Sequence, residues 1–151
     1  MNADESLAYA AGYFDGEGSV WMKKKGLQLT VRVVSRDKES IAVLAEVLGG
    51  KVLPTVRVWK GRTLRNYWSW SAYGKEGQKA LRKLLPLLLG KREVAIAACS
   101  FDYSGSRLSD DERKRRVEFS NRPIYTCDHW ESGETRGKPG NPGTDGTYPK
   151  F

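Results

Sequence analysis

The chain begins with a stretch whose residues predict a helix. Asn2-Ala-Asp-Glu5 is a capping box, in which the asparagine and the glutamate each accept a hydrogen bond from the other's backbone amide. Small and apolar residues then continue to Phe14. Gly12, Gly16 and Gly18 are expected to end this helix, because glycine weakens helical order.

Side chains that alternate between polar and apolar follow the helix, in two pairs of stretches. In the first pair Leu29, Val31 and Val33 share one face, and polar or cationic residues share the other. This pair turns around Gly26, and the second pair turns at residues 60–62. The predicted strands cover residues 19–25, 28–35, 52–59 and 66–73.

Helical patterns separate and follow these strands. Asp37 can cap a helix whose apolar positions have the helical period until Gly49 and Gly50 stop it. Residues 75–89 are helical in pattern but contain Pro86, which should kink the helix or divide it. A further helix is predicted over residues 91–101, and a short basic helix runs from a second capping box, residues 109–112, to about residue 119.

These elements predict an α+β protein with the order αββαββα, extra helices after that core and an irregular C-terminal arm. Two hairpins with polar outer faces can form one four-stranded antiparallel sheet, whose other face is covered by the helices. Residues 1–119 are expected to form one domain. Residues 120–151 contain five glycines and four prolines without periodicity, and they are expected to form the arm.

Length and composition narrow the class of protein. A chain of 151 residues suits one domain with its own core. Neither an apolar run long enough to span a bilayer nor a secretory signal is evident, so a cytoplasmic location is expected and a membrane partner is not. Cys99 and Cys127 lie far apart without a CxxC pattern, which gives a zinc framework or a disulfide scaffold little support.

The chain carries a net charge of +8, which is concentrated in its middle. Residues 21–73 hold eleven lysines and arginines against three acids, whereas residues 120–151 hold four of each. A small basic domain with interleaved aromatic residues is typical of nucleic-acid binding. The alternative is a solvated basic face that keeps the protein soluble.

One motif carries candidate chemistry, the sequence LAYAAGYFDGEGSV of residues 7–20 at the end of the first helix. It resembles the signature of the LAGLIDADG homing endonucleases, with residues 10–18 at the nine positions of that signature. The departures are mild: Ala10 replaces the usual leucine, Phe14 the usual aliphatic residue and Glu17 the more common aspartate. The resemblance covers about residues 3–105, and αββαββα is the core fold of that family.

The residue types in the motif suit that resemblance on physical grounds. Ala8, Gly12 and Gly16 form a ridge of small residues, which lets two helix backbones approach closely, so two copies of the chain can pair along it. Asp15 and Glu17 lie at the negative end of the helix macrodipole, in a field that attracts a divalent cation. The alternative is an ordinary helix end with acids in a loop. The expected dimer interface is Ala8, Gly12, Asp15 and Gly16.

The resemblance implies a homodimer that makes Mg²⁺-dependent double-strand breaks at a pseudo-palindromic DNA target, as in intron homing. Glu17, with the carbonyl of Gly16, takes the position of the metal ligands. Lys91 takes the position of a family lysine that polarises the scissile phosphate or orders its water. The alternative is that Lys91 is a solvated lysine at the start of a helix. Ser35 falls near a polar residue that organises water, or else is the N-cap of the next helix.

The outer face of the predicted sheet is expected to contact DNA. An antiparallel ribbon fits a major groove, and its outward side chains recur every second residue. Trp68 and Trp70 are instead expected in the core, and Cys127 with His129 is too small a set for a metal site. The expected DNA-binding residues are Lys23, Lys25, Gln28, Thr30, Arg32, Arg57, Trp59, Arg62 and Arg65.

Two rival functions are compatible with the same fold. An RNA-splicing maturase would carry cationic surface away from the sheet, and would make RNA a partner. A non-catalytic DNA-binding regulator would have lost its acids, which the presence of Glu17 and Lys91 argues against. The arm retains Tyr125, Trp130 and Phe151, so part of it is expected to dock on its own domain or along DNA.

Overall fold

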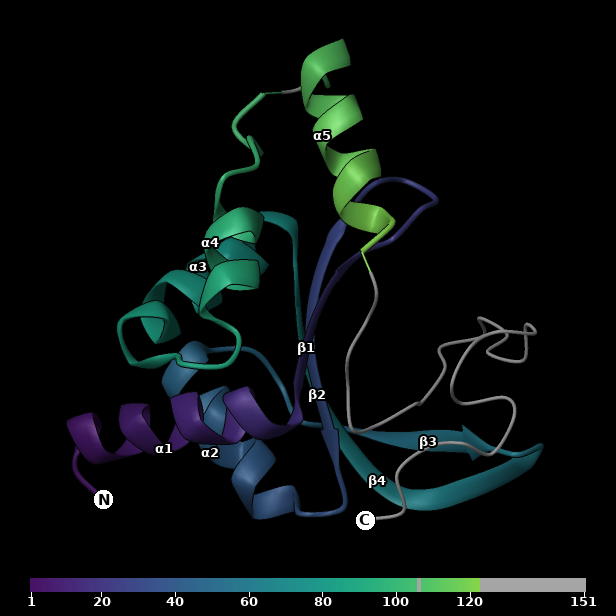
Figure 1. Cartoon of the computed structure of the whole chain (residues 1–151). Coiled ribbons are helices and arrows are strands. Elements are labelled where there is room, and N and C mark those ends of the chain that lie inside the picture. Colours follow the sequence, from purple (N-terminus) through teal and green to yellow (C-terminus); the bar gives the residue numbers. More distant parts are fainter. Residues whose placement is uncertain (106, 123–151) are drawn as a thin grey trace.

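A computed structural model describes residues 1–105 and 107–122, in which helices cover a four-stranded antiparallel sheet (Figure 1). The predicted order αββαββα, followed by further helices, is confirmed. The expected arm lies outside the described residues from residue 123 onward. The elements are α1 (Ala3–Glu17), β1 (Gly18–Met22), β2 (Leu29–Ser35), α2 (Lys38–Leu48), β3 (Leu53–Trp59), β4 (Arg62–Tyr73), α3 (Gly74–Leu84), the 3-10 turn η1 (Leu85–Leu87), α4 (Arg92–Cys99) and α5 (Asp110–Ser120).

The strand order is β1-β2-β4-β3, so the two hairpins meet in the middle of the sheet through β2 and β4. Leu29, Val31 and Val33 of β2 are fully buried in the core beneath the helices, as their alternation predicts. Figure 1 shows α1, α3 and α4 together on one side of β1 and β2. We call the opposite side, which carries Thr30 and Arg32, the outer face of the sheet.

Two helix starts confirm predictions made from capping residues. The Asn2 side chain accepts the Glu5 amide at 2.9 Å, and the Glu5 carboxylate accepts the Asn2 amide at 2.8 Å, which completes the capping box. At α2 the Asp37 carboxylate accepts the amides of Glu39 and Ser40 at 3.1 and 3.2 Å. Both caps satisfy amides that have no partner inside a helix.

The end of α1 differs from its prediction. The helix continues through Gly12 and Gly16 to Glu17, and neither glycine has a positive φ. Only Gly18 ends it. A Cβ at Gly18 would lie 2.5–2.6 Å from the ring and the carbonyl of Phe14, so no larger residue fits where the chain turns into β1.

The expectation that Trp68 and Trp70 belong to the core is confirmed. Trp70 is 1% exposed, and its indole N–H donates to the Gly49 carbonyl at 2.7 Å. Trp68 is half-buried and packs against the same core. β4 begins at Arg62, four residues earlier than predicted, because its pairing with β3 continues to the turn.

The later helices agree with the sequence except at one cap. Pro86 divides the predicted helix, since α3 ends before it and η1 contains it. The second capping box forms only in half: Ser109 accepts the Glu112 amide at 3.2 Å, but the Glu112 carboxylate pairs with Arg116. No helix within residues 1–105 and 107–122 is both long and apolar enough to cross a bilayer.

Candidate active site

α1 ends with two acids, Asp15 and Glu17, and its last turn contains no basic residue. The negative end of the macrodipole therefore coincides with these acids, without a compensating cation on the same helix. Both acids are half-buried, and Gly16 between them is exposed. A cation at this end has to come from another element or from solution.

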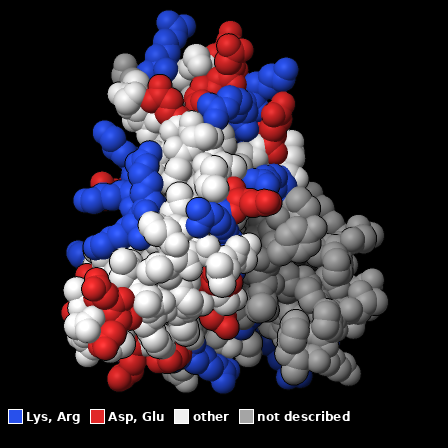
Figure 2. Space-filling model, turned by 60° about the vertical axis from the view of Figure 1, so that its left-hand side comes forward, with Lys and Arg blue, Asp and Glu red and all other residues white. Residues whose placement is uncertain are grey.

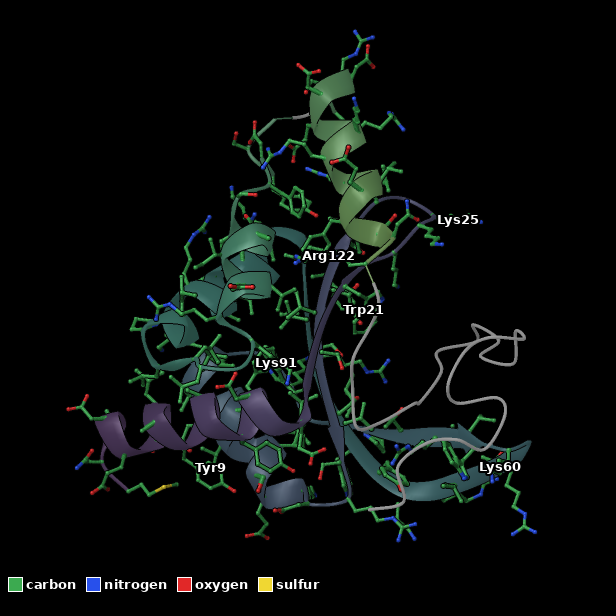
Figure 3. The ribbon with its side chains drawn as sticks, viewed as in Figure 1. Tyr9, Trp21, Lys25, Lys60, Lys91 and Arg122 are labelled. Carbon is green, nitrogen blue, oxygen red and sulfur yellow. The ribbon has the colours of Figure 1, made fainter. Side chains whose placement is uncertain are left out.

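Asp15 holds the loop that precedes α4. Its Oδ2 accepts the Leu89 amide at 2.7 Å and the Gly90 amide at 3.2 Å, and its Oδ1 accepts the Lys91 amide at 2.9 Å. The Lys91 ammonium in turn donates to the Asp15 carbonyl. Figure 3 shows Lys91 between the end of α1 and this loop. The fold thus brings Lys91 to the motif across 76 positions of sequence.

The surroundings of Asp15 keep it ionised. Partial burial, the largest single influence, raises the pKa of Asp15, but the amides of Leu89, Lys91 and Gly90 and the charge of Lys91 together hold it below its usual range. Three hydrogen bonds occupy most of the acceptor positions of one carboxylate. The carboxylate of Asp15, a residue of the expected dimer interface, thus anchors a loop of its own chain.

Ser35 is fixed by two donors. The Tyr13 hydroxyl donates to Ser35 Oγ at 2.7 Å, and the Asp37 amide donates to the same atom at 3.0 Å. The alternative that Ser35 caps the next helix is wrong, because Asp37 is the N-cap of α2. Burial first, and then the charges of Glu17 and Asp37, raise the pKa of Tyr13 against the effect of the Ser35 hydrogen bond, so the phenol remains a donor.

The ridge of small residues on α1 lies at the surface. Ala8, Gly12 and Gly16 are all exposed. A Cβ added at Gly12 or Gly16 would meet nothing within 4 Å. Tyr9 beside the ridge is 40% exposed and stacks on Tyr13, with ring centroids 6.0 Å apart. A second molecule can therefore reach this side of the helix.

The structure corrects one expected DNA contact. Thr30 is 1% exposed, because Trp21 and Tyr73 flank it on the neighbouring strands. Of the other residues expected to contact DNA, five are exposed and three are half-buried. The exposed ones are Lys23, Lys25, Gln28, Arg62 and Arg65, and the half-buried ones are Arg32, Arg57 and Trp59.

Neighbouring side chains hold two of the arginines on the sheet. Arg32 Nη2 donates to Thr55 Oγ1 at 3.3 Å, across the strand that separates them. Arg57 Nη1 donates to the Tyr67 hydroxyl at 3.4 Å, and its guanidinium lies 5.4 Å from the centre of that ring. Stacking of this kind limits the rotamers of a long cationic side chain. These two arginines are therefore partly oriented before any ligand binds.

The donors at the end of α1 suit a hard divalent cation. In the described part of the chain, no group of three or more His, Cys, Asp or Glu side chains could hold a metal. Mg²⁺ commonly takes only one or two protein carboxylates and completes its shell with water and phosphate oxygens. Glu17 and the exposed backbone at Gly16 provide such a partial set, since Asp15 is committed to its loop.

The sequence did not reveal the roles of Asp15 and Tyr13. Asp15 acts on residues at least 74 positions away, which no local pattern can indicate. Tyr13 lies one helical turn before Glu17, a spacing that places the two on one side of the helix and offers a signal for their proximity.

No protein-family model and no curated protein matches the sequence. Two solved structures of the homing endonuclease I-CvuI are similar to this chain. One, in complex with the I-CreI target in the presence of magnesium with the DNA not cleaved, has a TM-score of 0.45 and 20% identity over 64% of this chain. The other, in complex with its own target in the presence of calcium, has a TM-score of 0.44 and 21% identity over 65%.

The match spans 65% and 67% of those two chains, about two thirds of their length. The likeness is one of fold, a mixed helix and strand arrangement with a four-stranded antiparallel sheet.

Proposed function

We propose that this chain is a single-motif LAGLIDADG homing endonuclease, which cuts both strands of DNA as a homodimer with Mg²⁺ as cofactor. One observation carries the proposal. The fold attaches Lys91 to the end of α1 through Asp15, two residues from Glu17, at the start of a basic sheet. A cation and an acid beside a surface for phosphates are the groups that phosphodiester hydrolysis requires.

Glu17 and the Gly16 carbonyl are the residues that would hold the metal. A bound Mg²⁺ supplies Lewis acidity toward the scissile phosphate. Lys91 has its ammonium fixed by the Asp15 carbonyl and its amide fixed by the Asp15 carboxylate. It can therefore present positive charge to a phosphate oxygen, or order a water, without first losing side-chain freedom.

Ser35 is proposed to orient water as a hydrogen-bond donor. A serine hydroxyl has two acceptor positions and one hydrogen. Tyr13 and the Asp37 amide occupy both acceptor positions. The Ser35 hydrogen can then only donate to a third group, which we propose is a water near the scissile phosphate.

The exposed ridge on α1 is proposed to pair with the same ridge of a second copy. Ala8, Gly12 and Gly16 carry little or no side chain, so two backbones can approach closely. Pairing brings two ends of α1 together, and with them two copies of Glu17 and Lys91. Each copy would serve one strand, which accounts for a double-strand break at a pseudo-palindromic target.

A library of plasmids with randomised pseudo-palindromic inserts tests this proposal. Incubated with the chain in Mg²⁺, the library should yield linear products whose ends define one recurrent site, and chelation of the metal should abolish them. Absence of cleavage, combined with absence of binding to any insert in Ca²⁺, would contradict the proposal.

One observation favours a second candidate, an RNA-splicing maturase on the same fold. The side of α3 that faces away from the sheet exposes Lys75, Lys79, Arg82 and Lys83, and Figure 2 shows Lys and Arg gathered on the helical side of the molecule. Such a stripe can contact a phosphate backbone that does not touch the sheet. The maturase would bind structured RNA in the presence of saturating target DNA, and Lys79→Glu with Arg82→Glu would abolish that binding while DNA cleavage persists.

A further inference from the structure

α5 carries a buried ion pair that faces the sheet. Arg116 Nε donates to Glu112 Oε1 at 3.1 Å, and the two side chains are 8% and 9% exposed. Burying an ion pair costs desolvation energy unless further hydrogen bonds occupy its remaining donors and acceptors. Glu112 and Arg116 both make such hydrogen bonds. Glu112 Oε1 also accepts the Asp102 amide at 2.8 Å.

The remaining nitrogens of Arg116 connect α5 to two loops. Nη2 donates to the Asp102 carbonyl at 2.5 Å, and Nη1 donates to the Leu27 carbonyl at 3.3 Å. The guanidinium also lies 4.0 Å from the centre of the Tyr103 ring. The Tyr103 hydroxyl accepts the Leu29 amide at 2.8 Å. Tyr103 therefore binds the first residue of β2, and Arg116 binds the chain two residues before it.

The segment held by this cluster is the turn between β1 and β2. Leu27 has φ +48°, a left-handed conformation that costs a residue other than glycine roughly 1 kcal/mol or more. Its side chain is buried, and its carbonyl is the atom that Arg116 binds. Lys23, Lys24 and Lys25 on the other side of the turn are exposed. Figure 3 shows Lys25 at the tip of this hairpin, beside α5.

We propose that Arg116 is a positioning residue for this lysine-bearing turn: it fixes Leu27 so that Lys23, Lys24 and Lys25 meet phosphates at the outer end of a DNA half-site. The inference rests on the proposed function, and it assigns a purpose to α5, a helix that follows the αββαββα core in the chain. Arg116 itself is buried and would touch no DNA.

The length of β1 predicts where these phosphates lie. β1 begins directly after Glu17, and an extended strand advances about 3.3 Å per residue, which places the turn roughly 20 Å from the acid. Successive phosphates of one strand are about 3.4 Å apart along the duplex axis, so with β1 lying along that axis the contacts would be about 6 base pairs from the cut.

A double variant separates positioning from stability. Arg116→Met alone would remove the buried partner of Glu112 and leave its carboxylate paired only with Arg115, whose side chain is 48% exposed, so this variant could unfold the domain. Glu112→Leu with Arg116→Met removes both charges, and apolar replacement of a buried pair is often neutral for stability. It still deletes the bond to Leu27. Arg115→Met is the matched control, because Arg115 pairs with the same carboxylate but its other bonds go to Ser100.

Two measurements on the full chain test the proposal. Limited trypsin digestion below the melting temperature reports the turn without DNA, and cleavage after Lys23, Lys24 or Lys25 should accelerate about tenfold or more in the double variant. Phosphate-ethylation interference and the salt dependence of binding to the target in Ca²⁺ report the contacts. The double variant should lose interference about 6 base pairs from the cut, and its salt slope should fall by about 0.9 for each lost phosphate contact.

Arg115→Met should resemble the parent in both measurements. Arg116→Lys keeps the charge but has one nitrogen in place of three, so its results should fall between those of the parent and the double variant. The proposal is overturned if the double variant keeps the parental digestion rate at the turn, or keeps the parental salt slope and interference pattern. If the parent binds no DNA, the proposed function fails. The digestion result then still decides whether Arg116 holds the turn.

Discussion

Asp15 and Lys91 are joined at two points, although 76 positions separate them in sequence. The Lys91 amide donates to the Asp15 carboxylate at 2.9 Å, and the Lys91 ammonium donates to the Asp15 carbonyl. With the amides of Leu89 and Gly90 on the same carboxylate, these bonds fix the loop before α4 to the end of the motif helix. The first acid of the motif therefore positions the lysine, and the second, Glu17, is the one that we propose as a metal ligand.

Asp15→Asn should weaken this attachment without a change of shape. The amide group of asparagine keeps one acceptor oxygen but turns an N–H₂ donor toward backbone amides that are themselves donors. We expect the free energy of unfolding to fall by about 1–3 kcal/mol, and cleavage to fall more strongly than DNA binding, because Lys91 is displaced. Urea denaturation and paired cleavage and binding assays measure these effects.

Glu46→Gln on the exposed side of α2 is a suitable control, with an expected change within about 0.5 kcal/mol. An Asp15→Asn protein with parental stability and parental cleavage would show that the attachment has no consequence for either property.

The stability that Asp15 provides should depend on pH in one direction. Its pKa in the folded protein lies below that of an unfolded aspartate, about 3.9. The contribution is therefore complete above the unfolded pKa and is lost as the pH falls through the folded pKa. The difference in unfolding free energy between parent and Asp15→Asn should be constant from about pH 5 to 7 and shrink below about pH 4. A difference that grew on acidification would refute this assignment.

Gly12→Leu should separate folding of the chain from its pairing. Gly12 is an exposed glycine within α1 and its Cβ position is clear of other atoms, so leucine should stabilise the isolated chain by up to about 1 kcal/mol through helix propensity. The same side chain would separate the two ridges, so dimerisation and cleavage should fall together. Sedimentation velocity and thermal denaturation measure both properties.

Ala42→Leu, at an exposed position of α2 away from the ridge, provides the comparison. A Gly12→Leu protein that sediments as a fully active dimer would exclude this interface.

The sequence predicted best what depends on neighbouring residues. The caps at Asn2 and Asp37 and the division at Pro86 are local, because each acts on residues within one helical turn. The burial of Leu29 and Trp70 follows from the alternation of side chains along a strand, which is evident without identifying the strand it pairs with.

What the sequence did not predict depends on distant partners. The Asp15 attachment, and the bond from Arg116 to Leu27 across 89 positions, become visible only when the chain is folded. The second capping box was predicted from spacing alone. An arginine one turn further along offers Glu112 a buried partner, and this pairing prevails over the capping bond. Thr30 lies at a position that the alternating pattern of β2 predicts to be exposed, but two large aromatic neighbours bury it.

Replacement of Glu17 by glutamine tests the central claim most directly, because it keeps the shape of the side chain and removes the charge that would bind Mg²⁺. Single-turnover cleavage of the target in Mg²⁺ should fall by orders of magnitude, while affinity for the same DNA in Ca²⁺ stays within about twofold of the parent, as it should for the exposed control Glu76→Gln on α3. A Glu17→Gln protein that cuts at a rate close to that of the parent would contradict the account.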